Sequence, residues 1–511
     1  MESNPVNKGL YLQLLFIISI CVIVVTKSII YFQYSLQLID TDQAYMWQAA
    51  TDFANGHFYE PRYYGQNYNT MLEAFLAAPL LFLKIPVYAS LPLVTIILSL
   101  FPFLFSAFFL FLKNQKVSAL IVLSILICLP AQFDLLTSLP RGFVTGLFFT
   151  SFFICSIISP QNMRLLFLNT AMALLAYFVN QNSVLVSIPF LFYLFLINYQ
   201  KRIYFIVTCS ALLLAIPLDF FFNQFYRLHP DYVLQSTFNT FSLKYFIQAI
   251  SHLDERFQHI GFFIPNQCYT LMLALGLLSW LLFKQNKKAF KAFVVFIAII
   301  LFSFFASKVS DGSNWVYMSY SRMYLGIPIY IALFLPLIRF NLNKIALVLL
   351  CLPLLFSIYK LGFIKSELKK EDQRTISRGV RLLSLESCMD ITKFYKNKSE
   401  ENNCHFLLVS STFWLNTIVS NAGPALYKDY PDNQETRFEK RYWLRNKNKN
   451  RLISKFIFLS SDYNLNLLLP TKQKFELIKL DDYGLYLVKN NQLKMGEFID
   501  YINTIEPGLN D

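Results

Sequence analysis

The sequence predicts an α-helical membrane protein that crosses the bilayer many times and carries a small α/β domain at its C-terminal end. Of its 511 residues, 55% are hydrophobic, only 15% are charged, and 53 are Phe. A soluble domain of this length would contain fewer apolar and more charged residues. Long apolar runs recur as far as residue 361, and beyond that point charged residues are mixed with short apolar runs.

The first 361 residues form the predicted membrane part. A run of about 20 apolar residues is long enough to cross a bilayer as a helix. About 11 such runs are present, at 10–32, 87–112, 117–133, 142–159, 163–179, 183–198, 203–223, 266–284, 289–307, 323–339 and 343–361. A further apolar run at 71–83 is short and contains Pro79, so it either crosses the membrane or lies in the interface.

The basic loops decide between these two alternatives, because Lys and Arg are enriched in cytoplasmic loops. If 71–83 stays on the outer side, all of the short basic loops face the cytoplasm, with Lys8, Lys113, Lys116, Arg164, Lys201, Arg202, Lys284, Lys287, Lys288, Arg339 and Lys344. We therefore expect 11 crossings, a cytoplasmic N-terminus and an extracytoplasmic C-terminal domain. The same topological bias accounts for a net charge of +14, so the charge does not predict binding to nucleic acid.

Residues 362–511 predict the small extracytoplasmic α/β domain. Residues 367–395 have helical character, and apolar runs at 405–409, 455–459 and 485–488 predict strands. Cys388 and Cys404 lie in this region, and the sequence leaves open whether they form a disulfide. The basic stretch 437–455 either contacts lipid headgroups or a sugar phosphate, or is a solvated loop.

Two later outer loops complete the predicted outer face. The loop 225–265 contains an amphipathic surface helix at 242–258, which either covers the groove for a lipid tail or lies on the interface. The loop 308–320 is polar and aromatic. We expect it to complete an acceptor pocket together with the first outer loop.

The first outer loop, 33–86, carries the densest chemistry. Asp40 and Asp42 follow the first span directly, where carboxylates are costly unless they are solvated or have a function. Residues 43–54 predict a short amphipathic helix on the outer surface, which Gly56 ends. The aromatic cluster YYGQNY at 63–68 comes next. Its rings either stack on a sugar or anchor the loop at the membrane interface.

These features together resemble bacterial members of the GT-C superfamily of integral-membrane glycosyltransferases, which includes protein O-mannosyltransferases and aminoarabinose transferases. The resemblance rests on the aspartates after the first span, the short helix, the YYGQNY turn and the sequence LEAFLAAPL at 72–80. It covers 38–92 closely and the remainder by architecture, with shorter echoes in PRGF at 140–143 and SRMYL at 321–325.

The resemblance implies a GT-C-like catalytic domain over 1–361 in the bacterial cytoplasmic membrane. The implied reaction transfers a sugar from a polyprenyl-phosphate carrier to a glycan, lipid or protein acceptor on the outer face, usually with inversion. The acidic pair of the family aligns with Asp42 and Gln43. Since Gln43 is not acidic, either Asp42 works alone or Asp40 supplies the second group.

The residue chemistry suits this reaction. An acceptor hydroxyl that attacks the sugar carbon needs a base, and Asp42 is the candidate, while Asp40 is alternatively the cap of the helix that follows. The leaving phosphate needs cations or a divalent metal ion. Candidates for phosphate binding are Arg62, Arg141, Arg322 and Lys308, and candidates for contact with the acceptor or sugar are Tyr64, Gln66, Tyr68, Glu73 and His57.

Structural alternatives exist for several of these residues. Arg141 and Arg322 are equally well explained as side chains that extend from span ends to the interface, and Glu73 as an ion-pair partner of Arg62. No His and Cys spacing resembles a zinc site. Two other functions remain open, a polymerase or ligase of lipid-linked glycans and a flippase or transporter of them. A polymerase should concentrate its chemistry in a late outer loop, and a transporter should show paired repeats.

Overall fold

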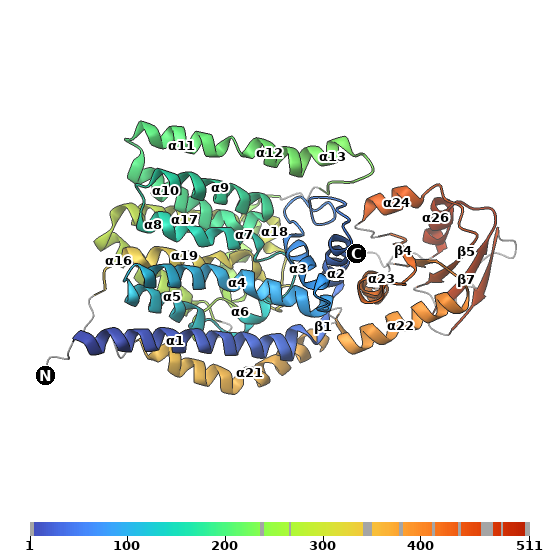
Figure 1. Ribbon diagram of the computed structural model, residues 1–511, viewed down its shortest axis with the longest axis horizontal. Coiled ribbons are helices and arrows are strands. Elements are labelled where there is room, and N and C mark those ends of the chain that lie inside the picture. The colour runs from blue at the N-terminus through green and yellow to red at the C-terminus, as the bar shows by residue number, and fades with distance from the viewer. Residues whose placement is uncertain are drawn as a thin grey trace.

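The computed structural model describes residues 5–235, 240–264, 267–340, 350–377, 382–410, 414–437, 441–460, 474–481 and 484–505. A bundle of helices occupies one end of the molecule and a small α/β unit occupies the other (Figure 1). The helices of the bundle run side by side along the long axis of the molecule. Between the bundle and the α/β unit lie α2 and α3, which belong to the first predicted outer loop.

The helical part contains these elements: α1 (Pro5–Ile30), η1 (Tyr31–Ser35), α2 (Thr41–Ala54), α3 (Leu72–Phe82), α4 (Val87–Leu112), α5 (Lys116–Cys128), α6 (Ala131–Leu136), α7 (Thr145–Phe149), η2 (Thr150–Phe152), α8 (Phe153–Ile158), α9 (Met163–Val179), η3 (Gln181–Ser183), α10 (Val184–Asn198), α11 (Arg202–Leu212), α12 (Ala215–Asp219), η4 (Phe220–Gln224), α13 (Phe225–Leu228), α14 (Leu243–Ser251), α15 (Leu253–Phe257), α16 (Tyr269–Gln285), α17 (Lys287–Ser303), α18 (Ser307–Ser310), η5 (Tyr320–Tyr324), α19 (Gly326–Phe334), η6 (Leu335–Leu337) and α21 (Leu352–Ser377).

The length and composition of these helices identify the protein as a helical membrane protein. In the described part of the chain, five helices are long and apolar enough to cross a bilayer: Gly9–Ser35, Val87–Leu112, Gln181–Asn198, Arg202–Leu228 and Tyr320–Leu337. Shorter apolar helices lie at Leu72–Phe82, Lys116–Cys128, Thr145–Ile158, Met163–Val179 and Tyr269–Gln285.

The ends of several helices follow from local sequence. The predicted span 117–133 is divided, because Leu129 precedes Pro130 and adopts an extended conformation that ends α5. The predicted span 343–361 lies partly outside the described residues, since 341–349 are not described. The helix α21 begins at Leu352 and continues well past 361, and it packs against α1 and α5.

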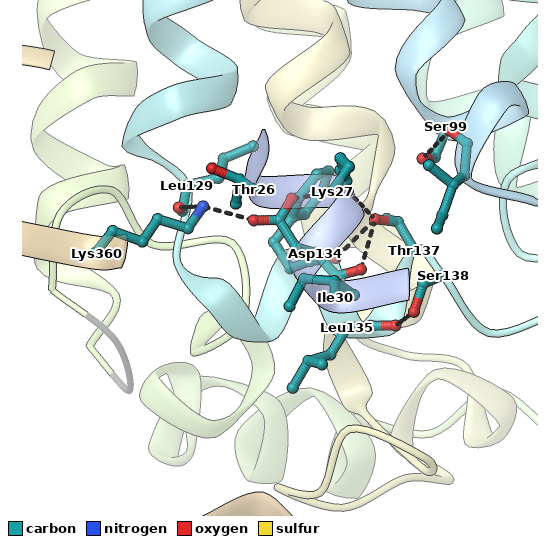
Figure 2. A network of polar contacts seen from close by, with 12 residues as sticks. Thr26, Lys27, Ile30, Ser99, Leu129, Asp134, Leu135, Thr137, Ser138 and Lys360 are labelled. Atoms are coloured by element: carbon teal, nitrogen blue, oxygen red, sulfur yellow. Dashed lines mark hydrogen bonds and ion pairs between the residues drawn. The ribbon is translucent and has the colours of Figure 1, made fainter. Parts of the chain in front are cut away.

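A buried ion cluster joins three of these helices (Figure 2). The Asp134 carboxylate on α6 lies 2.7 Å from the Lys27 Nζ of α1 and 2.5 Å from the Lys360 Nζ of α21. All three side chains are buried. Lys27 also donates to Thr137, and Lys360 donates to the carbonyl of Leu129. Each charged group therefore has a partner, which a buried charge requires.

The α/β unit contains a five-stranded mixed sheet. Its elements are β2 (Leu383–Ser384), α22 (Leu385–Glu401), β3 (Phe406–Val409), α23 (Trp414–Leu426), β4 (Asp432–Glu435), α24 (Tyr442–Asn448), β5 (Lys455–Leu459), β6 (Phe475–Lys479), β7 (Leu485–Asn490) and α26 (Met495–Ile505), and the strand order is β4-β3-β5-β7-β6. Strand β3 runs parallel to β4 and β5, whereas β7 is antiparallel to β5 and β6. Apolar clusters cover the sheet on both faces.

The predicted strands β3, β5 and β7 are confirmed. The prediction of one helix over 367–395 is wrong, because α21 ends at Ser377 and α22 begins at Leu385. Between them, β2 pairs with β1 (Leu38–Ile39), which directly precedes the first helix of the outer loop. Cys388 and Cys404 are both buried free thiols.

The predicted short helix of the first loop is confirmed as α2, but its exposed position is wrong. Eight consecutive residues from Gln43 to Ala50 are buried, because α3 packs against α2 on one side and α23 of the α/β unit packs on another. The predicted surface helix 242–258 divides into α14 and α15. The apolar residues Leu243, Ile247 and Ile250 of α14 are exposed, as the prediction of an interfacial helix requires.

Candidate active site

The site begins at the N-terminus of α2. The Asp40 side chain accepts a 2.9 Å hydrogen bond from the backbone N–H of Gln43, so it caps the helix as Asp often does. Its carboxylate also forms an ion pair with Arg141. Asp42 lies in the first turn of α2, where the helix dipole favours a negative charge. The two aspartates therefore have different surroundings, and only Asp42 lines the cavity described below.

A tight turn holds the aromatic cluster in place. The backbone N–H of Gln66 donates to the carbonyl of Tyr63, and the central residues Tyr64 and Gly65 both have positive φ, at 44° and 80°. This conformation suits Gly at the second central position. A Cβ at Gly65 would lie 2.1 Å from the carbonyl oxygen of Val233. The turn therefore packs closely on the later loop, and its Gln66 and Tyr68 side chains line the cavity.

The loop that carries Arg141 is fixed by the residue after it. Gly142 has φ +76°, and a Cβ there would collide with the Asn69 side chain. The Gly142 N–H donates to Glu73 at 2.9 Å, and its carbonyl accepts from Asn180 at 2.9 Å. Asn69 in turn donates to the Arg141 carbonyl. These bonds to both sides of the loop hold Arg141 at the cavity wall.

The loop between α17 and α19 supplies two more cations. The Lys308 Nζ lies over the Tyr68 ring, 3.3 Å from its centroid, and this contact links the segment between α2 and α3 to the segment between α17 and α19. Arg322 donates a 2.8 Å hydrogen bond to the carbonyl of Asp311. Burial, together with the charge of Arg322, lowers the pKa of Lys308 to about 8. The pKa of Tyr68 is raised to about 12, mainly by burial and also by the charge of Asp42.

These segments enclose a cavity of about 400 Å³. Its polar lining consists of Asp42, Tyr63, Gln66, Tyr68, Asn69, Arg141, Asn180, Gln181, Asn182, Ser303, Lys308, Asp311, Arg322 and Tyr324, and its apolar lining of Phe143, Val184, Leu185, Ile299, Val309, Met318 and Met323. The charged residues come from the first turn of α2, from the loop before α7 and from the segment between α17 and α19, whereas several apolar residues come from α10 and α17. The cavity therefore offers charged and hydrocarbon-like surfaces to one ligand.

Six of the predicted site residues meet in this cavity: Asp42, Gln66, Tyr68, Arg141, Lys308 and Arg322. The other five do not line it. Asp40 and Tyr64 are buried beside it, and His57 is exposed. Glu73 is fully buried and holds the Gly142 backbone, so it does not pair with Arg62. Arg62 donates to the carbonyl of Phe178 and stacks on the Phe222 ring.

Several lining residues are missing from the sequence prediction. Asn180, Gln181 and Asn182 form a run of three amides between two apolar segments, and this interruption is a signal that could have identified them. Asp311 adds a second carboxylate to the cavity. Gln43, at the position of the expected second acid, is buried outside the cavity lining. Within the described residues its amide nitrogen has no hydrogen-bond partner.

No group of three or more His, Cys, Asp or Glu side chains that could hold a metal ion occurs among the described residues. In comparisons with known proteins, no family model, no curated protein and no solved structure matched the chain.

Proposed function

We propose that the protein is a membrane glycosyltransferase that uses a polyprenyl-phosphate sugar. The observation that carries this proposal is the composition of one cavity, which Asp42, Arg141, Lys308 and Arg322 line together with apolar residues of α10 and α17. A lipid-linked sugar needs these three elements together: a base for the acceptor, cations for the phosphate and an apolar path for the chain.

In the proposed reaction, the acceptor hydroxyl transfers its proton to Asp42 while its oxygen attacks the anomeric carbon. The bond between this carbon and the phosphate oxygen breaks, and the electron pair stays on the lipid phosphate. Arg141, Lys308 and Arg322 stabilise the charge that develops on this leaving group, because guanidinium and ammonium groups donate to phosphate oxygens. Attack from the side opposite the phosphate inverts the configuration of the sugar.

The proposal includes the topology expected from the basic loops. The chain crosses the bacterial cytoplasmic membrane 11 times, with the N-terminus in the cytoplasm and the α/β unit outside. The run 71–83, which is the helix α3, stays on the outer side. The sugar donor is then the undecaprenyl form, as the resemblance implies, and the acceptor is an envelope glycan, lipid or protein.

The test is transfer of labelled sugar from polyprenyl-phosphate donors to envelope fractions by the purified protein. We expect the wild type to transfer sugar and Asp42→Asn to lose transfer by about 10² to 10⁴-fold, the usual contribution of a general base. Asp231→Asn is the matched control, because Asp231 is exposed and does not line the cavity. Equal transfer by wild type and Asp42→Asn would remove Asp42 from its role. Absence of transfer with every donor would favour the polymerase or flippase function.

A further inference from the structure

A single arginine of α15 contacts both ends of the loop that carries two of the cavity cations. This loop, between α17 and α19, begins with α18, which contains Lys308, and ends with η5, which contains Arg322. The guanidinium of Arg256 donates to the carbonyl of Val309 at 2.7 Å and to the hydroxyl of Ser310 at 3.2 Å. These two acceptors directly follow Lys308 in the chain.

The backbone of the same arginine holds the other end of the loop. The hydroxyl of Ser321 donates to the carbonyl of Arg256 at 2.9 Å and accepts from the backbone N–H of His259 at 3.2 Å. Ser321 and His259 are both fully buried, and Ser321 directly precedes Arg322. Arg256 therefore binds the chain next to Lys308 through its side chain and next to Arg322 through its backbone.

The helices around this arginine pack against the same loop. Helix α15 packs on η5, and α14 packs on α18. The ring of Phe257 meets the Tyr324 ring edge-on, with 4.9 Å between their centroids. The ring of Phe246 on α14 stacks on Phe305 at 4.6 Å. Since Phe305 precedes α18 and Tyr324 ends η5, aromatic contacts support the loop at both ends.

An arginine is a costly residue for this position. Arg256 is only 1% exposed, and the acceptors of its guanidinium are a carbonyl and a hydroxyl rather than carboxylates, so its buried charge is expensive. The rings of Tyr320 and Phe304, at 5.1 and 5.9 Å, compensate only in part. A neutral side chain would cost less but could not donate to two acceptors in a fixed fork. We propose that Arg256 is a positioning residue that sets the placement of Lys308 and Arg322 in the cavity.

The binding of a lipid phosphate by these two cations rests on the proposed function, whereas their placement does not. The placement is measurable at Lys308 itself, because burial and the charge of Arg322 lower the pKa of this lysine to about 8. The other charged residues that line the cavity are Asp42, Arg141 and Asp311. Release of the loop would expose the Lys308 amine and separate it from Arg322. Its pKa would then rise toward the usual 10.5.

The test labels the lysines of the full-length protein in detergent with trace acetic anhydride between pH 7 and 11, and mass spectrometry follows the Lys308 peptide. We expect a midpoint near pH 8 in the wild type and a midpoint higher by about one pH unit or more in Arg256→Met. Ser321→Ala removes the bond to the Arg256 carbonyl and changes no charge. It should raise the midpoint by a smaller amount, which separates displacement of Lys308 from loss of the arginine charge and provides a milder variant for folding.

Arg441→Met is the matched control. Arg441 is also buried, at 4% exposure, but it donates to Asn433 in the α/β unit at 2.8 Å. Its loss should destabilise the protein and leave the Lys308 midpoint unchanged. A wild-type midpoint near 10.5, equal midpoints in the wild type, Arg256→Met and Ser321→Ala, or an equal shift in Arg441→Met would each overturn the proposal.

Sugar transfer by the same preparations distinguishes this proposal from the proposed function. Arg256→Met should lower kcat/KM for the donor by about tenfold, the effect of losing about one hydrogen bond to the phosphate. Absence of transfer by the wild type, with the expected midpoints, would reject the proposed function and retain the positioning role of Arg256. Transfer by the wild type with equal midpoints in all variants would retain the function and reject the positioning role.

Discussion

The phenol of Tyr45 on α2 donates a 2.7 Å hydrogen bond to the buried carboxylate of Glu435 on β4. This bond joins the first outer loop to the α/β unit across 390 residues of sequence. Asn421 on α23 donates to the same carboxylate oxygen at 2.8 Å. Together with the packing of α23 on α2, these contacts make the α/β unit a support for the helix that carries Asp42.

The first prediction follows from this bond. Tyr45→Phe should lower the free energy of unfolding by about 1.5 to 3 kcal/mol, the usual value for a hydrogen bond to a charged group, and should reduce sugar transfer because α2 loses a support. Tyr427→Phe is the matched control, since its hydroxyl bonds an exposed carbonyl within the α/β unit. Thermal unfolding in one detergent compares the variants. Equal effects of the two substitutions would show that the contact between α2 and β4 has no special importance.

The local features of the first loop could be predicted from sequence, whereas the burial of its helix could not. The helical spacing of the apolar residues Met46, Ala50 and Phe53 predicts α2, and the YYGQ sequence predicts the turn. The pattern of α2 does not indicate that a second layer, α23, covers its remaining face. Strand β4 was missed for a related reason, because its sequence DNQE is polar although Asn433, Gln434 and Glu435 are buried. The hydrogen-bond partners of these three side chains lie on α2 and α23, on α24 and just before α24. The sequence of β4 itself gives no sign of partners so far away along the chain.

The candidate site was predictable in part because the expected topology assigns several loops to a common side of the membrane. Arg141, Lys308 and Arg322 are far apart in sequence, yet the positive-inside argument places all of them with Asp42. Arg62 meets the same criterion but stacks on Phe222 instead. The shared cavity shows that these segments lie together, and side-chain packing decides which cations reach it.

A second prediction separates the roles of the two aspartates. Asp40→Asn keeps a good helix cap, because Asn caps as well as Asp, but it loses the charge that pairs with Arg141. We expect this variant to transfer sugar with a weaker affinity for the donor, while Asp42→Asn loses the chemical step. Steady-state kinetics distinguish these effects as a raised KM and a lowered kcat. A loss of kcat in Asp40→Asn equal to that of Asp42→Asn would mean that both carboxylates act in the reaction.

The third prediction concerns pH. Lys308 has a pKa lowered to about 8 by burial and by Arg322, so it is charged below this pH and becomes neutral above it. The KM for the donor should therefore rise several-fold as the pH increases from 7 to 9. Lys308→Arg should abolish this rise, because a guanidinium stays charged over this range, and Lys308→Met should have a high KM throughout. A flat pH profile of the wild-type KM would exclude Lys308 from phosphate binding.

The last prediction concerns the buried ion cluster of Asp134, Lys27 and Lys360 (Figure 2). Removing the Asp134 charge leaves two buried ammonium groups without a counter-ion. Asp134→Asn should therefore lower the free energy of unfolding by about 3 to 5 kcal/mol, as breaking a buried ion pair does. Lys360→Met should cost less, because Lys27 and Asp134 remain paired at 2.7 Å and the apolar side chain replaces a charge that had to be desolvated.

Thermal and guanidinium unfolding of the full-length protein in the same detergent measure the order of stability of the wild type, Lys360→Met and Asp134→Asn. The double variant with Asp134→Asn and Lys360→Met is the decisive comparison, since it retains one unpaired lysine instead of two. It should be more stable than Asp134→Asn alone, because the second substitution removes a buried charge that has lost its partner. If Asp134→Asn were as stable as the wild type, the two lysines would have to be neutral or solvated in the folded protein. The cluster would then not be the electrostatic link between α1, α6 and α21.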